Sequence, residues 1–337
     1  MVRSHIFSIT WVIFFMSTPA QSRQAGKNRS QADRTLDRSF IWITRIFAFS
    51  IAAVLVWIGF QVAVQGLPAL EKFGLGFLFT STWSPNPPNV ELGILPSIYG
   101  TLASSFIGLL IAVPIGIGTA VLLSENILPL SVRTILVFLV ELLAAIPSVV
   151  YGLWGIFVLT PFLGTVGTWL NKFLGWIPLF SRPESGAIGG PGLLPAGIIL
   201  AIMTLPIITA ISRDALTSVP KNLREAAYGL GCTRWETLLK VIIPAAFSGI
   251  VSAVMLALGR AMGETMAVTM LIGNSTNKIS ASLFEPSNTI ASLIASQFAE
   301  AGGLQISALM YAAFVLFILT LIVNIMAELI VLRVKRL

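Results

Sequence analysis

The sequence predicts an all-α protein that crosses a membrane six times, and its composition and long apolar runs are the observations behind this prediction. Apolar residues make up 56% of the 337 residues, charged residues make up only 10%, and the mean hydropathy is +0.90. A soluble domain usually carries about 25% charged residues, because its surface faces water. A chain with so little charge therefore indicates a protein whose solvent is lipid.

Six apolar runs are each about 20 residues or longer, which is enough for a helix to cross roughly 30 Å of hydrocarbon. Inside lipid the backbone must satisfy its own hydrogen bonds, so helices are the structure expected for these runs. Residues 42–337 are therefore expected to form one transmembrane domain. We place its spans at residues 42–64, 97–123, 134–160, 193–217, 246–272 and 306–332.

The lysines and arginines predict the direction of the spans. With the N-terminus in the cytoplasm, the inner segments hold seven of them in residues 1–45, one between spans two and three, five between spans four and five, and three at the C-terminus. The outer loops hold four, and Arg260 lies within a span. This asymmetry places both termini in the cytoplasm. It also accounts for the net charge of +7, so no nucleic-acid partner is expected.

Residues 1–41 are polar and basic, and they are expected to form a disordered cytoplasmic tail. Within this tail, residues 1–20 are similar to a short secretory signal, with Arg3 followed by an apolar run and then by small residues. Five positive charges in residues 21–41 oppose export of the tail. Two interpretations of residues 1–20 stay open: a cleaved signal, or a dispensable extension with translation starting at Met16.

The loop between spans four and five, residues 218–244, carries local signals for two short helices. Residues 221–230 are good helix formers, and Gly231 can end a helix with a positive φ. Thr233 and Glu236 have the spacing of a capping box, which starts a second helix. The loop is therefore predicted to be a helix–glycine–helix elbow on the cytoplasmic face.

This elbow resembles the EAA loop of ABC-importer permeases, which reads Glu-Ala-Ala, three residues, Gly, nine residues, and then I-x-[LI]-P. The resemblance implies a type I ABC-importer permease architecture, in which the elbow docks on a separate ATPase subunit and couples it to the membrane helices. The residues that match the pattern are Glu225, Ala226, Ala227, Gly231 and Pro244, with Val241 in place of the first Ile.

Several absences from the sequence restrict its chemistry. It contains no GxxxxGK[ST] pattern, so the chain is not expected to be an enzyme that hydrolyses ATP itself. A single cysteine, Cys232, and a single histidine, His5, leave no cluster for a metal ion. No metal and no cofactor are therefore expected in this chain.

Four further stretches are similar to the phosphate-specific transporter permeases of the PstC type: residues 92–102, 141–155, 212–216 and 259–268. The resemblance covers the chain from about Phe40 onwards and implies a subunit that forms the translocation path for inorganic phosphate in a bacterial inner membrane. It also implies three kinds of partner: a homologous second permease subunit, a cytoplasmic ATPase dimer, and an extracytoplasmic phosphate-binding protein.

Span five contains the best candidates for contact with the substrate. Arg260 lies near its middle, where an ionised side chain costs several kcal/mol unless it faces a cavity or a partner. Glu264 is four residues further on, which in a continuous helix would let the two side chains pair. A guanidinium group matches the geometry of an oxyanion. We therefore expect Arg260 to line the substrate path and Glu264 to hold it; the alternative is an ion pair that only fixes helix packing.

Two other functions stay open from the residues alone. The charge of Arg260 would also suit another oxyanion, such as sulfate or molybdate. A proton-coupled secondary carrier could use Glu264 or the more weakly indicated Glu141 and Glu328, which are otherwise expected to be structural. Two similar halves around broken helices, which are typical of such carriers, are not evident in the sequence.

Overall fold

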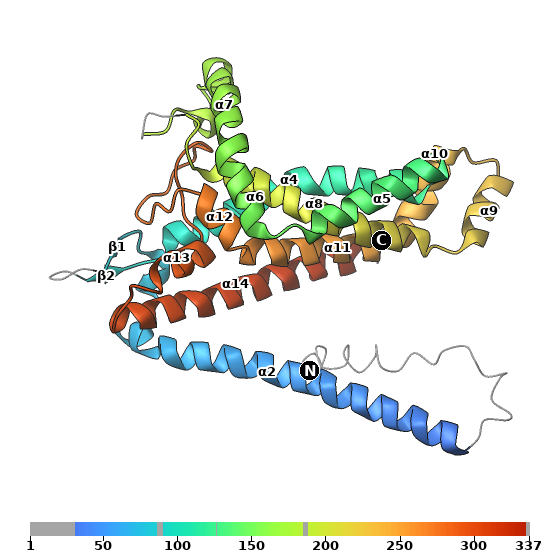
Figure 1. Ribbon diagram of the computed structural model, residues 1–337, viewed down its shortest axis with the longest axis horizontal. Helices are drawn as coiled ribbons and strands as arrows, with labels where there is room; N and C mark the ends of the chain where they lie inside the picture. Colours follow the sequence, from blue (N-terminus) through green and yellow to red (C-terminus); the bar gives the residue numbers. More distant parts are fainter. Residues whose placement is uncertain (1–30, 86–89, 126, 185–187, 335–337) are drawn as a thin grey trace, which may run out of the picture. The chain divides into compact units, whose positions relative to one another are not determined.

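The computed structural model describes residues 31–85, 90–125, 127–184 and 188–334, and almost all of the regular structure in these ranges is helical (Figure 1). Two compact units make up the chain, residues 1–58 and residues 59–337, and helix α2 (Gln31–Phe73) contributes to both. The signal-like segment 1–20 lies outside the described residues. Residues 31–41, the end of the expected tail, form the first turns of α2.

The part of α2 that belongs to the first unit is apolar and exposed. Every side chain from Asp37 to Ile58 is exposed, although this stretch is rich in large apolar residues. The hydroxyls of Thr44 and Ser50 donate to the carbonyl oxygens of Phe40 and Ile46, at 2.9 and 2.8 Å, so these polar groups are satisfied within the helix. Such a surface suits a helix that is surrounded by lipid.

The centre of the second unit is a pair of long helices, α4 (Leu95–Ser124) and α8 (Leu193–Thr217), which lie against each other along their length (Figure 1). Small residues allow this close approach. A Cβ added at Gly197 would lie 2.5 Å from the Ile107 side chain, and one added at Gly116 would lie 2.8 Å from that of Ile208. A third helix, α11 (Ile243–Gly263), packs against both.

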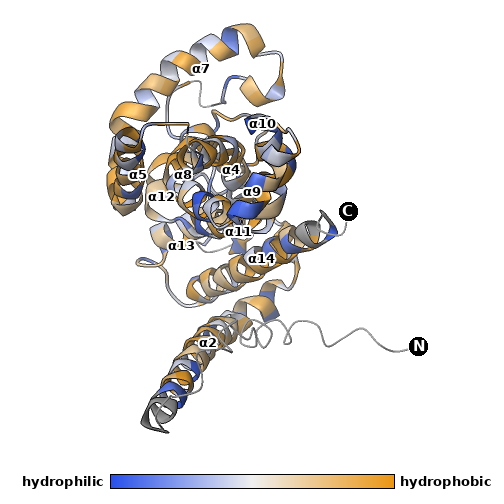
Figure 2. Ribbon diagram, turned by 90° about the vertical axis from the view of Figure 1, so that its right-hand side faces the viewer, coloured by the Kyte–Doolittle hydropathy of each residue, from blue (hydrophilic) through white to orange (hydrophobic). Residues whose placement is uncertain are grey.

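Six helical segments in the described residues are long and apolar enough to cross a membrane, which confirms the predicted number of spans. Figure 2 shows hydrophobic residues along most of the helices, with hydrophilic residues gathered on α9. The six segments are Asp37–Phe73, Leu95–Ser124, Ser148–Leu174, Leu193–Thr217, Arg234–Gly263 and Leu304–Leu329.

The bounds predicted for span three, 134–160, are wrong, because the apolar run contains a helix break. Helix α5 (Leu130–Ala145) ends where Ile146 becomes extended, with φ −67° and ψ 128°. The residue before a proline is pushed out of the helical region, and Pro147 follows here. The spanning segment then begins at Ser148 and consists of α6 (Ser148–Trp154), a π-helical turn η1 (Gly155–Leu159) and α7 (Thr160–Leu174).

Span five, predicted at 246–272, is also interrupted. It begins earlier than predicted, with α10 (Arg234–Thr237) and the π-helical turn η3 (Leu238–Ile242), which run into α11. Helix α11 ends at Gly263, and a separate short helix, α12 (Met266–Leu271), follows. α12 packs closely on α6, where a Cβ added at Gly152 would lie 3.3 Å from the Ala267 backbone. The broken parts of spans three and five therefore lie against each other.

Shorter elements gather at the end of the second unit opposite α9 (Figure 1). They include α3 (Gly76–Phe79), the 3₁₀ turn η2 (Pro178–Phe180), α13 (Ile290–Gln297), and an antiparallel two-stranded sheet of β1 (Trp83–Ser84) and β2 (Glu91–Leu92). Apolar side chains of α3, the two strands and α13 form one cluster with the start of α14 (Leu304–Val334), in which the rings of Phe77 and Tyr311 stack 4.8 Å apart.

Candidate functional site

The predicted elbow between spans four and five is present. Helix α9 (Lys221–Gly229) ends in a turn in which the N–H of Cys232 donates to Ala227 O at 3.1 Å and Gly231 takes a φ of +85°. These features form a glycine-terminated helix end. Thr233 and Glu236 then complete the capping box of α10, since the Thr233 hydroxyl accepts from Glu236 N and the Glu236 carboxylate accepts from Thr233 N.

The residues that match the EAA pattern occupy distinct positions on this elbow. Ala227 is buried, whereas Glu225, Ala226 and Gly231 are exposed, and Pro244 lies in the first turn of α11, directly after the π-helical turn η3. Large apolar side chains are exposed beside them: Leu223, Tyr228, Leu230 and Trp235. Leu230 alone has 85% of its surface exposed. The elbow therefore presents large apolar side chains among its exposed hydrophilic residues.

An ion pair that the sequence did not indicate holds α9 in place. Arg224 Nη1 donates to both carboxylate oxygens of Glu125, at 2.7 and 2.8 Å, and Nη2 donates to the carbonyl oxygen of Leu216 at 3.2 Å. The two side chains are only 21% and 16% exposed. Glu125 is 99 residues away in the sequence, so no local pattern could have shown the pairing.

A cavity of about 490 Å³ lies beside this ion pair, between α9, α10 and the end of α4. It combines charged, aromatic and aliphatic walls. Its lining residues are Glu125, Ile127, Arg224, Tyr228, Arg234, Trp235 and Leu238.

Arg260 and Glu264 do not form the ion pair expected from their spacing. Arg260 is exposed in the last turn of α11, but Glu264 follows the end of that helix, with φ −66° and ψ 124°. Because the helix stops between them, the one-turn geometry is lost, and no ion pair joins them in the part of the chain that the structure describes. Arg260 lies three residues before the end of α11, and α12, which follows α11 in the chain, packs on α6.

Tyr151 connects the two sides of the break in span three. It is buried, and its hydroxyl donates to the carbonyl oxygen of Leu143 on α5 at 2.8 Å. The hydrogen bond therefore spans the break between α5 and α6. The two more weakly indicated glutamates that a proton-coupled carrier could use are both exposed: Glu141 in the last turns of α5 and Glu328 on α14.

The described residues contain no group of three or more His, Cys, Asp or Glu side chains placed to hold a metal.

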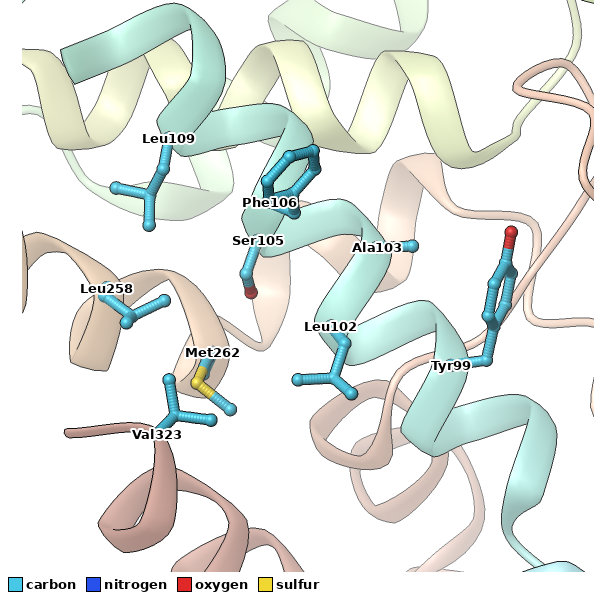
Figure 3. A pocket seen from close by; sticks show the side chains of 9 residues that line it. All are labelled: Tyr99, Leu102, Ala103, Ser105, Phe106, Leu109, Leu258, Met262 and Val323. Atoms are coloured by element: carbon cyan, nitrogen blue, oxygen red, sulfur yellow. The ribbon is translucent and has the colours of Figure 1, made fainter. Parts of the chain in front are cut away.

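A second cavity, of about 530 Å³, lies between α4, α11 and α14 (Figure 3). Its walls are apolar apart from hydroxyl groups, and the Ser105 hydroxyl oxygen among them is buried without a hydrogen-bond partner in the described structure. A cavity without a charged wall does not suit an anion. Its lining residues are Tyr99, Leu102, Ala103, Ser105, Phe106, Leu109, Leu258, Met262 and Val323.

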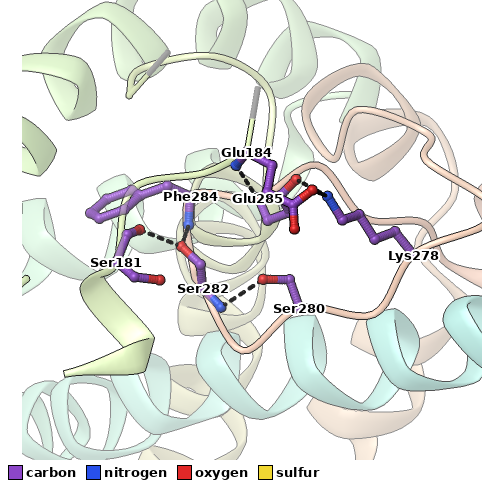
Figure 4. Close-up of polar contacts among 7 residues, drawn as sticks. All are labelled: Ser181, Glu184, Lys278, Ser280, Ser282, Phe284 and Glu285. Atoms are coloured by element: carbon purple, nitrogen blue, oxygen red, sulfur yellow. Dashed lines mark hydrogen bonds and ion pairs between the residues drawn. The ribbon is translucent and has the colours of Figure 1, made fainter. Parts of the chain in front are cut away.

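The loops at the other end of the unit are joined by a charged cluster (Figure 4). Lys278 pairs with Glu184 and also with Glu285, whose nearer oxygen is 3.5 Å away. The hydrogen bond to Glu184 is the main cause that raises the pKa of the Lys278 amine above its ordinary value. Glu285 also accepts from the backbone N–H of Glu184 at 3.0 Å. This cluster fixes two loops that are about 100 residues apart in sequence.

Known proteins are similar to this chain in sequence over most of its length. Residues 112–336 match the family described as "Binding-protein-dependent transport system inner membrane component". The phosphate transport system permease protein PstC of Pasteurella multocida is 42% identical over 314 residues, which cover 93% of this chain and 97% of the relative. The protein of the same name from Mesorhizobium japonicum is 43% identical over 314 residues, which cover 91% of this chain and 95% of the relative.

Among solved structures, one chain of a bacterial ABC transporter involved in the import of the acidic polysaccharide alginate superposes with a TM-score of 0.54 and 16% identity. The superposition covers 91% of this chain and 100% of that chain. At this identity the likeness concerns the fold alone.

Proposed function

Because the chain belongs to the family of binding-protein-dependent transport system inner membrane components, and within it to the permeases of the PstC type, we propose that it forms the translocation path for inorganic phosphate in an ATP-driven importer. It is a multi-pass protein of the bacterial inner membrane. The elbow at residues 218–244 supports coupling to a separate ATPase, and Arg260 supports an anionic substrate.

The exposed arginine at the end of α11 is the observation that carries the proposal. Arg260 lies in a spanning segment, where an ionised side chain must face a water-filled path or a partner. Its guanidinium group can donate several hydrogen bonds to a tetrahedral oxyanion in one plane. Phosphate passing the end of α11 would therefore meet a fixed positive charge in a region otherwise poor in charge.

Glu264 is proposed to moderate that charge rather than to hold the arginine by a direct ion pair. It lies just beyond the end of α11, with its side chain half-buried. A negative charge near Arg260 lowers the attraction for phosphate, and a path must release its substrate as well as attract it. The breaks at Pro147 and Glu264 directly adjoin two spanning segments, and irregular backbone at membrane depth is tolerated only where it lines a cavity or is covered by protein.

The elbow is proposed to dock on a cytoplasmic ATPase dimer, with the apolar side chains of Leu223, Tyr228, Leu230 and Trp235 as the contact surface. Aromatic and apolar side chains of this kind are typical anchors in protein interfaces. We further propose, from the distribution of lysines and arginines, that both termini lie in the cytoplasm. A homologous second permease would complete the path, and an extracytoplasmic phosphate-binding protein would deliver the substrate to it.

Uptake of radiolabelled phosphate by cells that lack this chain tests the proposal. Cells are complemented with wild type, Arg260→Ala, Arg260→Lys or the control Leu256→Ala, which changes an exposed residue one turn earlier on α11. We expect loss of uptake with Arg260→Ala, partial uptake with Arg260→Lys, and normal uptake with the control. Normal uptake by Arg260→Ala, or by Arg260→Ala combined with Glu264→Ala, would contradict a role in the path.

Competition with unlabelled anions tests the substrate in the same cells. Excess phosphate should abolish uptake of the label, whereas equal excesses of sulfate or molybdate should leave it unchanged. Equal competition by all three anions would contradict specificity for phosphate while leaving an oxyanion path in place.

A further inference from the structure

The Arg224–Glu125 ion pair joins three elements at one point. Arg224 lies in α9, Glu125 is the capping residue at the end of α4, and the carbonyl oxygen of Leu216 belongs to the last turn of α8. The N–H of Glu125 donates to Val121 O at 3.0 Å, so the carboxylate is held on the last turn of α4. A displacement of the guanidinium group therefore acts on the ends of two membrane helices at once.

The buried apolar cluster below the elbow does not hold α9. One buried cluster joins α4, α8, η3 and α11, through residues such as Ala120, Leu216, Leu238 and Ile250. Among the described residues of that cluster, none comes from α9. α9 packs instead against η3 and α10, which follow it in the chain. The side chain of Arg224 provides a contact that reaches from α9 across to α4.

The geometry of this pair distinguishes it from an ordinary surface pair on the same elbow. Lys240 and Glu236 also form an ion pair, at 3.3 Å, but they are four residues apart on one helical segment and their side chains are 71% and 44% exposed. Such exposed pairs contribute little. The Arg224–Glu125 pair is short, largely shielded from solvent, and joins elements that are distant in sequence. A shielded pair of this kind resists separation.

We propose that Arg224 is a positioning residue that transmits movement of the elbow to α4 and α8 through its bonds to Glu125 and Leu216. The inference rests on the proposed function, because the movement would be imposed by the ATPase bound to α9. ATP-driven closure would pull α9, and the ion pair would carry that displacement past the η3 junction to the core pair of helices. Breaking the pair would then separate ATP hydrolysis from transport.

The test uses the complete importer, purified with its ATPase and reconstituted in vesicles with its phosphate-binding protein. Phosphate uptake and ATP hydrolysis are measured in the same vesicles for wild type, Arg224→Gln, Glu125→Gln and the control Arg333→Gln, which changes an exposed residue of α14 outside the elbow. Arg224 forms one wall of the existing cavity, so its replacement by a smaller side chain introduces no clash. We expect the phosphate carried per ATP to fall at least about fivefold in the first two variants, the size of a typical coupling energy between sites, and to stay unchanged in the control.

Two results would overturn the inference. One is an unchanged ratio of uptake to hydrolysis in Arg224→Gln. The other is loss of the ATPase from the purified complex of that variant, since the pair would then serve docking. If neither single variant yields a folded permease, the exchanged pair Glu125→Arg with Arg224→Glu decides: a coupled complex supports the inference and an assembled but uncoupled complex refutes it. Failure of the proposed function would show differently, as absence of phosphate uptake by wild-type vesicles.

Discussion

Replacing Gly100 with alanine should destabilise the protein, because α4 touches the backbone of another segment there. A Cβ built on Gly100 would lie 1.9 Å from the carbonyl oxygen of Asn288 and 2.8 Å from the Ser287 hydroxyl oxygen. Asn288 is completely buried, and Ile290 donates its N–H to the Thr101 hydroxyl at 3.0 Å. The segment around Asn288 can therefore move away from the new methyl group only by losing this hydrogen bond to α4.

The magnitude follows from that distance. A carbon atom and a carbonyl oxygen normally stay about 3.3 Å apart, so the backbone must move by about 1.4 Å. Overpacking of this kind typically costs about 1–3 kcal/mol, and loss of the Ile290–Thr101 hydrogen bond adds about 0.5–1.5 kcal/mol. The better helix propensity of alanine offsets about 0.5–1 kcal/mol. At an unfolding entropy of about 2.1 cal/mol/K per residue, a net cost of about 2 kcal/mol corresponds to a fall in Tm of about 3 °C.

Thermal stability of the detergent-purified protein measures this effect, with the loss of the monodisperse peak on size-exclusion chromatography as the readout. Gly118→Ala is the matched control, because Gly118 lies on the same helix and a Cβ there meets nothing within 4 Å. We expect the control to keep or slightly raise the Tm. Equal Tm values for the two variants would refute the reasoning that a backbone contact requires glycine at position 100.

Three further predictions concern the elbow and the outer loops. Gly231→Ala should weaken the elbow by about 1 kcal/mol because its φ is +85°, and it should reduce phosphate uptake, whereas Gly229→Ala, with an ordinary φ and open space, should not. Thr233→Ala should lower the Tm by the loss of a helix cap, about 1 kcal/mol, and Thr233→Ser should restore it; equal Tm values for both would contradict the capping role. The pKa of Lys278 is raised in the folded protein, so its contribution to stability is complete below its ordinary pKa of 10.5 and is lost as pH rises through the higher folded value. The difference in Tm between wild type and Lys278→Gln should therefore be constant from neutral pH to about pH 10 and shrink above it; a difference that grows with pH would contradict the assignment.

The helix breaks are the part of the fold that the sequence did not predict. Hydropathy found six spans because lipid imposes one requirement on every residue of a span. It could not find the break at Pro147, because Pro114 and Pro206 lie inside helices that continue past them. What distinguishes Pro147 is tertiary: Tyr151 donates across the break to the carbonyl oxygen of Leu143, and α6 packs on α12. A proline supplies the opportunity for a break, and its neighbours in space decide whether it occurs.

Within the site, the turns of the elbow were predictable from the sequence, whereas its ion pair was not. The end of α9 and the start of α10 were predictable because Gly231, Thr233 and Glu236 act on their immediate neighbours. The Arg224–Glu125 pair was not, because it depends on how α4 and α9 come together across 99 residues. The missing ion pair between Arg260 and Glu264 has a similar cause, since its prediction assumed a helix that in fact ends at Gly263.

The turn that ends α9 also offers a single site for a fluorescent label. Cys232 is the chain's single cysteine and lies in that turn, with its backbone bonded to Ala227 and its side chain half-buried. A thiol-reactive fluorophore would thus label this chain at one position, in the joint between the two elbow helices, with no other residue replaced. The colour or anisotropy of such a dye would follow the bending of the joint in real time, through each round of nucleotide binding and release.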